Sequence, residues 1–277
     1  VVLDPVLIFG IGPFPELGVS GAAAATVTAQ ALVSLLFFKA VLREKVLFPH
    51  LRLWVLVPVK VWREIVRIGV PSAVQNLIYA GISMILTRLI TGWGDLAVAA
   101  QRVGSQIESV SWMVGDGFSA AVNAFLGQNY GAKRYDRVRR GYFCAIAMTA
   151  AWGLCTTFLL IGMARPLFSI FLHEEKVMAI GVNYLRIVGL SQMFMMVEQT
   201  SIGAFSGLGR TLYPSIVSVT FTSARIPVAV LLSSVMGLSG IWWALSISSM
   251  VKGCILFVSF VVFLYVFLER KKDEETV

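Results

Sequence analysis

Three acidic residues stand inside long apolar stretches of the sequence. Glu108 and Asp116 lie within residues 101–131, and Glu198 lies within residues 179–206. A carboxylate at membrane depth is unfavourable by several kcal/mol unless it faces protein, water or a partner. Such residues are therefore candidates for binding a cation or carrying a proton, which is electrostatic chemistry rather than bond breaking.

A polar stripe accompanies Glu108. At helical spacing, the following small and polar residues share one face, with Asp116 at its edge: Gln101, Ser105, Glu108, Ser111, Gly115, Ser119 and Asn123. A stripe of this length follows a whole membrane span and could line a polar interior. The alternative is that Gly and Ser only permit close helix packing, and that Glu108 finds a neighbouring donor.

Glu198 is the sharper candidate of the acids, because it lies near the middle of its apolar stretch. This depth suits a group that takes up and releases a proton. The alternative is a simple hydrogen bond to another helix. The same face carries Ser191, Phe194, Ser201 and Phe205. Met195, within Met193-Phe-Met-Met196, could contact apolar cations through its polarisable sulfur, although Met and Phe are also ordinary lipid-facing residues.

Basic and amide side chains also occur in the apolar stretches, as Arg186, Arg225 and Lys252, and as Gln75 and Asn76. Arg225 lies near the middle of its stretch and could be the ion partner of Glu198 or Glu108. An internal ion pair would then be the simpler explanation of these charges. The two amides could contact a substrate.

The composition is that of an integral membrane protein. The 277 residues are 57% hydrophobic and 14% charged, with a mean hydropathy of +0.81, whereas soluble domains carry about 25% charged residues. The net charge of +8 falls between apolar segments rather than in a basic soluble domain, so no nucleic-acid partner is expected. Cys144, Cys155 and Cys254 form no metal or disulfide pattern and are expected to be free thiols in the membrane.

No catalytic or metal-binding motif is present, since His50 and His173 are not paired with a nucleophile and no P-loop occurs. The protein is therefore not expected to be an enzyme. Because the longest loop is too short for a nucleotide-binding module, active transport would have to use an ion gradient. The coupling ion would be H⁺ or Na⁺, with no other cofactor.

Apolar runs long enough to cross about 30 Å of hydrocarbon predict seven spans. They fall near residues 19–42, 65–90, 96–126, 141–163, 178–206, 212–235 and 240–267. Residues 1–12 are too short to cross alone and resemble the end of an eighth. Because they show no signal peptide and no initiator Met, we expect the chain to begin partway through a longer protein.

Lys and Arg predict the orientation, because short cytoplasmic loops hold the excess of positive charge. The basic connections are 43–64, 127–140 and 207–211, together with the C-terminal tail, so these segments are predicted to be cytoplasmic. Residues 51–67 mix Trp and cations around Pro58, which predicts an interfacial elbow helix along the inner leaflet.

A short internal repeat relates the first complete span to the last. Gly18-Val-Ser-Gly21 matches Gly237-Leu-Ser-Gly240, and both copies run inward from the outer side. A parallel repeat is typical of transporters built from two like-oriented bundles. With six spans from one copy to the next, it predicts a parent of twelve spans.

The order of these motifs resembles the multidrug and toxic compound extrusion (MATE) family in its bacterial drug-efflux members. The resemblance rests on Gln101–Ser109, Gly127–Ala132 with its basic run, Gly203–Thr211, Arg225–Pro227 and Gly237–Trp242, with Leu3–Gly10 and Gly18–Ala22 resembling the end of the first lobe. It covers essentially the whole chain, and the joint order is more specific than any one motif.

The resemblance implies an all-α polytopic membrane protein with two six-helix lobes around a central cavity. The chain would contain the end of the N-terminal lobe (1–42), a cytoplasmic inter-lobe loop with the elbow (43–64), the C-terminal six-helix lobe (65–268) and a cytoplasmic tail (269–277). The N-terminal lobe of the same polypeptide would be its missing partner. In this family some members have an acidic cation ligand in the helix matching residues 65–90, where this sequence has Gln75 and Asn76.

The resulting prediction is a secondary active antiporter of the bacterial inner membrane that exports organic cations in exchange for H⁺ or Na⁺ by alternating access. Glu198 would carry the coupling charge, Glu108 would line the same cavity, and protonation of Glu198 would release the drug. Arg225 is a further candidate for cation coupling or substrate binding. One alternative is a flippase or exporter of lipid-linked sugars in the same superfamily, which would favour an Arg-lined cavity. Another is a seven-helix receptor or scaffold.

Overall fold

The computed structural model describes residues 3–10, 15–43, 58–172 and 174–268. The chain divides into two compact units, Val1–Pro58 and Val59–Val277. The described residues form helices and contain no strand, which confirms the all-α prediction. Residues 51–57 of the predicted elbow and the predicted tail lie outside the described residues. Residues 59–67 belong to the long helix that follows.

The first unit contains α1 (Leu3–Phe9) and α2 (Gly18–Arg43), which pack against each other. Gly18 has a φ of 53°, a conformation open mainly to glycine. Three residues later, Gly21 lies so close to the carbonyl of Leu7 that a side chain would collide with it. The backbone of α2 therefore contacts the backbone of α1 directly.

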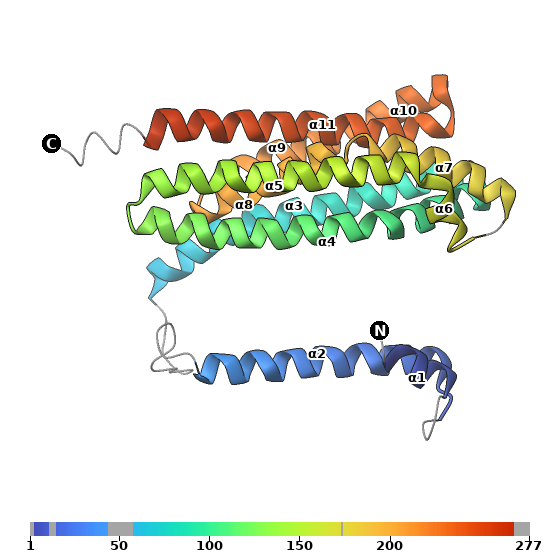
Figure 1. Cartoon of the computed structure of the whole chain (residues 1–277), viewed down its shortest axis with the longest axis horizontal. Helices are drawn as coiled ribbons and strands as arrows, with labels where there is room; N and C mark the ends of the chain where they lie inside the picture. The colour runs from blue at the N-terminus through green and yellow to red at the C-terminus, as the bar shows by residue number, and fades with distance from the viewer. Residues whose placement is uncertain (1–2, 11–14, 44–57, 173, 269–277) are drawn as a thin grey trace. The chain divides into compact units, whose positions relative to one another are not determined.

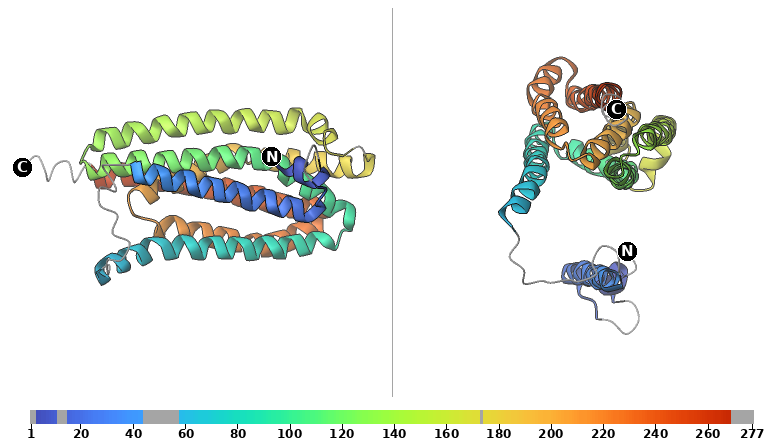
Figure 2. Two further views of the ribbon diagram at one scale, coloured as in Figure 1. Left: turned by 90° about the horizontal axis from the view of Figure 1, so that it is seen from below. Right: turned by 90° about the vertical axis from the view of Figure 1, so that its left-hand side faces the viewer.

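The second unit is a bundle of roughly parallel and antiparallel helices (Figures 1 and 2). Its elements are α3 (Val59–Thr91), α4 (Asp95–Gly131), α5 (Tyr135–Gly162), α6 (Ala164–Ser169), α7 (Glu175–Gly189), α8 (Gln192–Gly207), α9 (Leu212–Ser223), α10 (Arg225–Met236), α11 (Leu238–Phe263) and the π-helical η1 (Leu264–Leu268). The α4–α5 and α8–α9 connections lie at the same end as the end of α11, and the α3–α4, α6–α7 and α10–α11 connections lie at the other (Figure 1).

Two of the predicted spans are broken helices. α7 and α8 meet at a bend of 50°, and the break at Leu190 and Ser191 makes Gln192 the first residue of α8. α9 and α10 are separated at Ala224, three residues before Pro227. Proline lacks the N–H that would bond the carbonyl four residues earlier, which explains a break at this point. It leaves Arg225 as the first residue of α10.

Among the described residues, five helices or helix pairs are long and apolar enough to span a membrane, or six if α7 and α8 form one bent span. If α7 and α8 are counted as one span, six of the seven spans predicted from the sequence meet this criterion of length and hydropathy. The exception is the span predicted at 96–126, which lies within α4. This helix has the length, but its polar stripe lowers its hydropathy. The protein is nevertheless a multi-pass membrane protein, as predicted.

Helix α8 lies at the centre of the second unit, where it packs against α4, α5 and α11. Glycines bring the backbones close at each contact: Gly203 faces the carbonyl of Ser119 on α4, Gly153 of α5 faces Met193, and Gly253 of α11 faces the carbonyl of Phe194. Hydrophobic clusters fill the bundle toward both ends, one with Phe260 and the other with Trp242. α8 is thereby held at a defined depth and rotation, and it carries Glu198.

Candidate functional site

Two adjoining pockets lie within the second unit. The Glu108 pocket has a volume of about 320 Å³ and is bordered by Gln101, Ser105, Glu108 and Tyr184 among others. The Glu198 pocket has a volume of about 340 Å³ and is bordered by Gln75, Asn76, Asp116, Glu198 and Lys252 among others. Six residues border both: Tyr79, Trp112, Met195, Thr222, Arg225 and Ser249. Each pocket is large enough for a small organic molecule.

The six residues that the sequence suggested for cation coupling or substrate binding all line these pockets. Glu108 borders the first, Gln75, Asn76 and Glu198 border the second, and Met195 and Arg225 border both. They come from α3, α4, α8 and α10, so helix packing brings together residues far apart in the chain. Of the Met193–Met196 run, Met195 alone is found in the lining, while Met196 is buried against Gly115 and Gly153.

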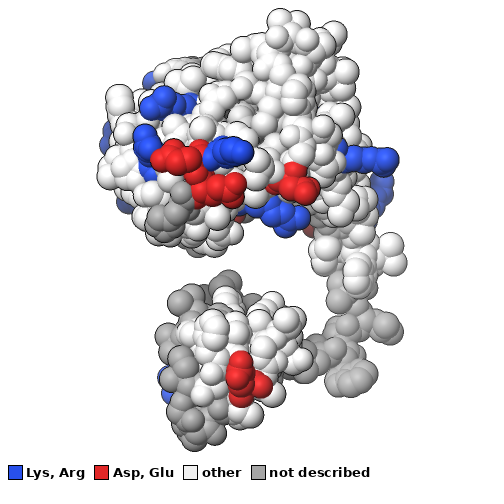
Figure 3. All heavy atoms as spheres, turned by 90° about the vertical axis from the view of Figure 1, so that its right-hand side faces the viewer, with Lys and Arg blue, Asp and Glu red and all other residues white. Residues whose placement is uncertain are grey.

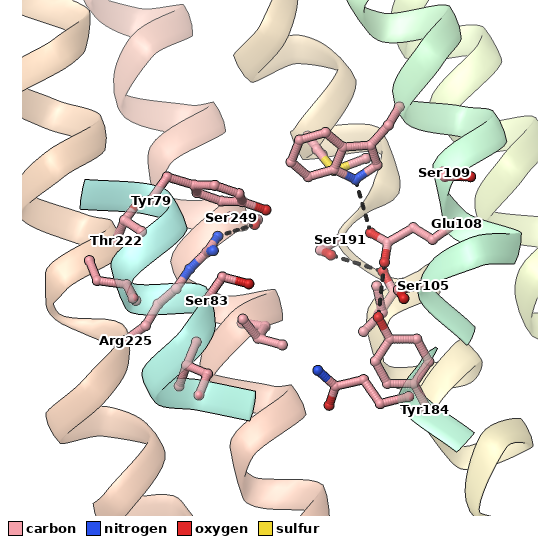
Figure 4. Close-up of a pocket in the computed structure, with 17 residues that line it drawn as sticks. Tyr79, Ser83, Ser105, Glu108, Ser109, Tyr184, Ser191, Thr222, Arg225 and Ser249 are labelled. Atoms are coloured by element: carbon pink, nitrogen blue, oxygen red, sulfur yellow. Dashed lines mark hydrogen bonds between the residues drawn. The ribbon is translucent and has the colours of Figure 1, made fainter. Parts of the chain in front are cut away.

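Glu108 is half-buried and accepts three hydrogen bonds from neutral donors, two of which, from Trp112 and Tyr184, are drawn in Figure 4. Trp112 donates to Oε1 at 3.3 Å, Gln192 to the same oxygen at 3.0 Å and Tyr184 to Oε2 at 3.1 Å. The carboxyl group of Glu108 is thus positioned at the pocket wall by hydrogen bonds from neutral groups, and it has no contacting cation among the described residues.

The polar stripe on α4 serves two purposes. Its first half, with Gln101, Ser105 and Glu108, borders the Glu108 pocket. In its second half, Gly115 packs against Met196, and the backbones of Ser119 and Asn123 lie against Gly203 and Gly207 of α8. Both interpretations of the stripe therefore hold, each for one half. At the edge, Asp116 is exposed and accepts a hydrogen bond from Gln199 at 3.3 Å.

Glu198 forms a buried ion pair with Lys252 of α11. The Lys252 Nζ to Glu198 Oε1 distance is 2.7 Å, and the side chains are only 6% and 9% exposed. Both residues border the Glu198 pocket. Taking two charges out of water is tolerated only when they are paired in good geometry. The carboxylate of Glu198 is therefore neutralised by the protein itself.

Arg225 forms no ion pair with Glu108 or Glu198 in the described structure. The position of Arg225 near the middle of its span had suggested such a pair. Its guanidinium donates to Ser248 and Ser249 of α11, both at 3.0 Å. Figure 4 places Arg225 with Tyr79, Thr222 and Ser249 on one side of the Glu108 pocket, and Glu108 with Tyr184 on the other. The broken helix explains the difference, because Arg225 begins α10 and reaches the hydroxyls of the neighbouring helix.

Several pocket residues were given no role from the sequence. Lys252 is the one charged residue within α11, and this alone could have marked it as a functional candidate, since ionisable groups in spans are rare. The spacing of residues in the sequence does not predict that Lys252 pairs with Glu198. Tyr184, Trp112 and Gln192 gave no comparable signal, because aromatic and amide side chains are common at the ends and interfaces of spans. The three cysteines are free and exposed on the bundle surface, on α5 and α11.

Fold and pockets together define a multi-pass helical membrane protein with charged groups facing an internal cavity, an arrangement used by transporters. The MatE family model matches residues 71–231, and the chain belongs to this family. The resemblance drawn from the motifs is thereby confirmed. Members of the family are transporters and not enzymes.

Individual relatives agree with this assignment. The chain is 31% identical to the "Probable multidrug resistance protein NorM" of Thermotoga maritima, over 87% of this chain and 53% of that protein. It is 29% identical to the protein of the same name in Deinococcus radiodurans, over 89% of this chain and 55% of that protein. The chain therefore spans about half the length of the curated relatives it matches.

The fold is also found in a solved structure, "Crystal structure of MATE in the straight conformation", with a TM-score of 0.84 and 21% identity. The similarity covers 97% of this chain and 60% of that one. At this identity it supports the fold and not the details of the site.

Proposed function

We propose that this chain forms the substrate-binding C-terminal lobe of a secondary active multidrug efflux transporter of the bacterial inner membrane. With the N-terminal lobe of the same polypeptide, it would export organic cations in exchange for H⁺ or Na⁺ by alternating access. Its C-terminus would face the cytoplasm. The names of the NorM relatives and the family assignment support export of drugs in general.

The observation that carries the proposal is the pair of adjoining pockets with a glutamate side chain in each lining, Glu108 and Glu198. Aromatic rings border both pockets at Tyr79 and Trp112, whose centroids lie 6.0 Å apart. A carboxylate beside aromatic faces and a thioether is suited to a cation with a large apolar body. This chemistry favours organic cations over lipid-linked sugars, whose charge is negative.

In the proposed cycle, Glu198 provides the negative charge for which the transported cation and the coupling ion compete. The two occupancies are mutually exclusive, because one carboxylate in a pocket of this size neutralises one cation at a time. Exchange follows when the pocket opens alternately to each side. Glu108 lines the same cavity and attracts the cation toward it, while Gln75, Asn76 and Met195 contact the bound molecule.

The test is exchange by the full-length protein in proteoliposomes, with ethidium as the exported cation and either a pH or a Na⁺ gradient as the driving force. Glu198→Gln is expected to reduce gradient-driven exchange by at least tenfold, because the competing charge is gone. Glu175→Gln is the matched control, since Glu175 is exposed and pairs with Arg165 at the surface. Exchange by Glu198→Gln at the wild-type rate would remove Glu198 from the coupling mechanism.

A further inference from the structure

Because Lys252 pairs with Glu198, either residue of this ion pair could carry the proton that is exchanged for the substrate. The Glu198 pocket has two acidic residues in its lining, Asp116 and Glu198, and two basic ones, Arg225 and Lys252. Its formal charge is therefore zero when all four are ionised. An organic cation that enters this pocket adds a positive charge in a poorly solvated space.

The two basic groups differ in the partners that hold them, since hydroxyl groups bind Arg225 and a carboxylate binds Lys252. The Arg225 guanidinium is anchored by Ser248 and Ser249, and Ser248 in turn donates to the carbonyl of Phe221. Arginine also keeps its proton at any pH relevant to a protein. Lys252, in contrast, has a single ion-pair partner among the described residues, Glu198, and its flexible stem borders the pocket.

We propose that Lys252 is a tethered cation that occupies Glu198 in the absence of substrate, and that its ammonium carries the proton exchanged for the organic cation. When the substrate cation pairs with Glu198, the Lys252 ammonium loses its counter-charge while remaining buried. An unpaired buried charge is unfavourable, and the group becomes neutral instead. The N–H bond breaks, its electron pair stays on Nζ and the proton passes to water in the pocket.

This exchange keeps the pocket electrically neutral before and after binding. One positive charge enters with the substrate and one leaves as a proton, while Glu198 stays ionised throughout. The inference rests on the proposed function, because it requires that organic cations bind at Glu198. It differs from a cycle in which Glu198 itself is protonated to release the drug.

The titratable groups that line the pocket together with Lys252 come from four helices. They are Glu198 on α8, Arg225 on α10, Asp116 on α4 and Tyr79 on α3. In the described lining, α9 contributes Ser218, Val219 and Thr222, and α7 contributes nothing that titrates. Arg225 stays charged and Asp116 is exposed, so Lys252 and Glu198 are the buried pair between which the proton has to be assigned.

The deciding experiment measures binding of tetraphenylphosphonium, a cation that does not titrate, to the purified full-length protein at several pH values. Competition with one proton makes the wild-type dissociation constant fall tenfold for each unit of rising pH. Lys252→Arg keeps the ion pair but cannot release its proton. We expect this variant to bind at least tenfold more weakly, with no dependence on pH. Lys176→Arg, at an exposed position, is the control and should retain the tenfold slope.

The same slope in Lys252→Arg as in wild type would overturn the inference, because the proton would then reside elsewhere, while cation export would remain supported. A wild-type protein that does not bind the probe would overturn the proposed function as well. Infrared difference spectra of the wild type decide the matter if the variant does not fold. If the wild type lost the absorption band of a protonated carboxyl group on binding, and Glu198→Gln showed no such loss, the proton would be assigned to Glu198 and the inference overturned. We expect no loss of this band in the wild type.

Discussion

Glu108 and Glu198 are both acids in the bundle interior, but they are stabilised differently. Glu198 has a cationic partner at 2.7 Å. Glu108 has three neutral donors on two other helices and its own, and it faces Arg225 only across the pocket (Figure 4). The negative charge of a carboxylate without a contacting cation is less neutralised, so it gives a more negative electrostatic potential in the pocket. Glu108 is therefore positioned to attract a cation, whereas Glu198 is positioned to exchange one cation for another.

This difference predicts the behaviour of Glu108→Gln. Removal of the charge is expected to weaken tetraphenylphosphonium binding by about tenfold, which corresponds to about 1.4 kcal/mol. The carboxamide can keep hydrogen bonds to Tyr184 and Gln192, because the Tyr hydroxyl can turn to accept. The fold should therefore remain, and the melting temperature should change little.

Ser109→Ala is the matched control for Glu108→Gln, since Ser109 borders the same pocket but bonds only to the carbonyl of Gln106. It should bind the probe like wild type. If Glu108→Gln also bound like wild type in an equilibrium titration, Glu108 would be a packing residue whose hydrogen bonds serve only the fold.

At the scale of elements, glycines position the pocket residues. Gly253 follows Lys252 directly, and its backbone lies against the carbonyl of Phe194, one helical turn before Glu198. This close contact brings α11 to α8 at the depth where the ion pair forms. The breaks between α7 and α8 and between α9 and α10 act in a similar way, because they begin new helices at Gln192 and Arg225.

A methyl group at the α4–α8 contact is expected to be destabilising. In Gly203→Ala the added carbon would collide with the carbonyl of Ser119, and overpacking of this kind costs about 1–3 kcal/mol. The melting temperature in detergent should fall by several degrees. Gly117→Ala on α4 is the control, because no atom lies near its position and Ala favours a helix. An equal fall in both variants would show that the contact is not tight.

At the scale of the whole molecule, the repeat seen in the sequence has a structural counterpart within each unit. Gly18 and Gly237 both have positive φ, 53° and 62°, and each lies at the start of a long helix. Three residues later, Gly21 and Gly240 each face a backbone carbonyl of the preceding helix, at Leu7 and Leu232. The two units thus share a helix-pair motif, as expected of two like-oriented bundles.

The ends of the second unit differ in charge. The end with the α6–α7 connection carries mixed acidic and basic side chains (Figure 3), including the Arg165–Glu175 pair at 2.9 Å. At the opposite end, the α4–α5 and α8–α9 connections and the first turns of α5 are mainly basic, with Arg134, Arg137, Arg140 and Arg210. An excess of positive charge is typical of cytoplasmic loops.

This asymmetry predicts the sidedness of the protein. In a cysteine-free background, an impermeant maleimide added to intact cells should label Lys176→Cys and not Arg137→Cys, since both positions are exposed but lie at opposite ends. Permeabilised cells should allow labelling of both, which serves as the control for reactivity. The reverse pattern in intact cells would place the α4–α5 connection outside.

The sequence alone determined the spans, the polar faces and the family, because hydropathy, helical spacing and motif order are local properties of a chain. Six of its candidate residues, Glu108, Glu198, Gln75, Asn76, Met195 and Arg225, border the two adjoining pockets, while their roles stay predictions. The tertiary structure decided which charges meet. Lys252 pairs with Glu198 and Arg225 does not, because pairing depends on the rotation and depth of helices that contact at glycines, and no local pattern records these.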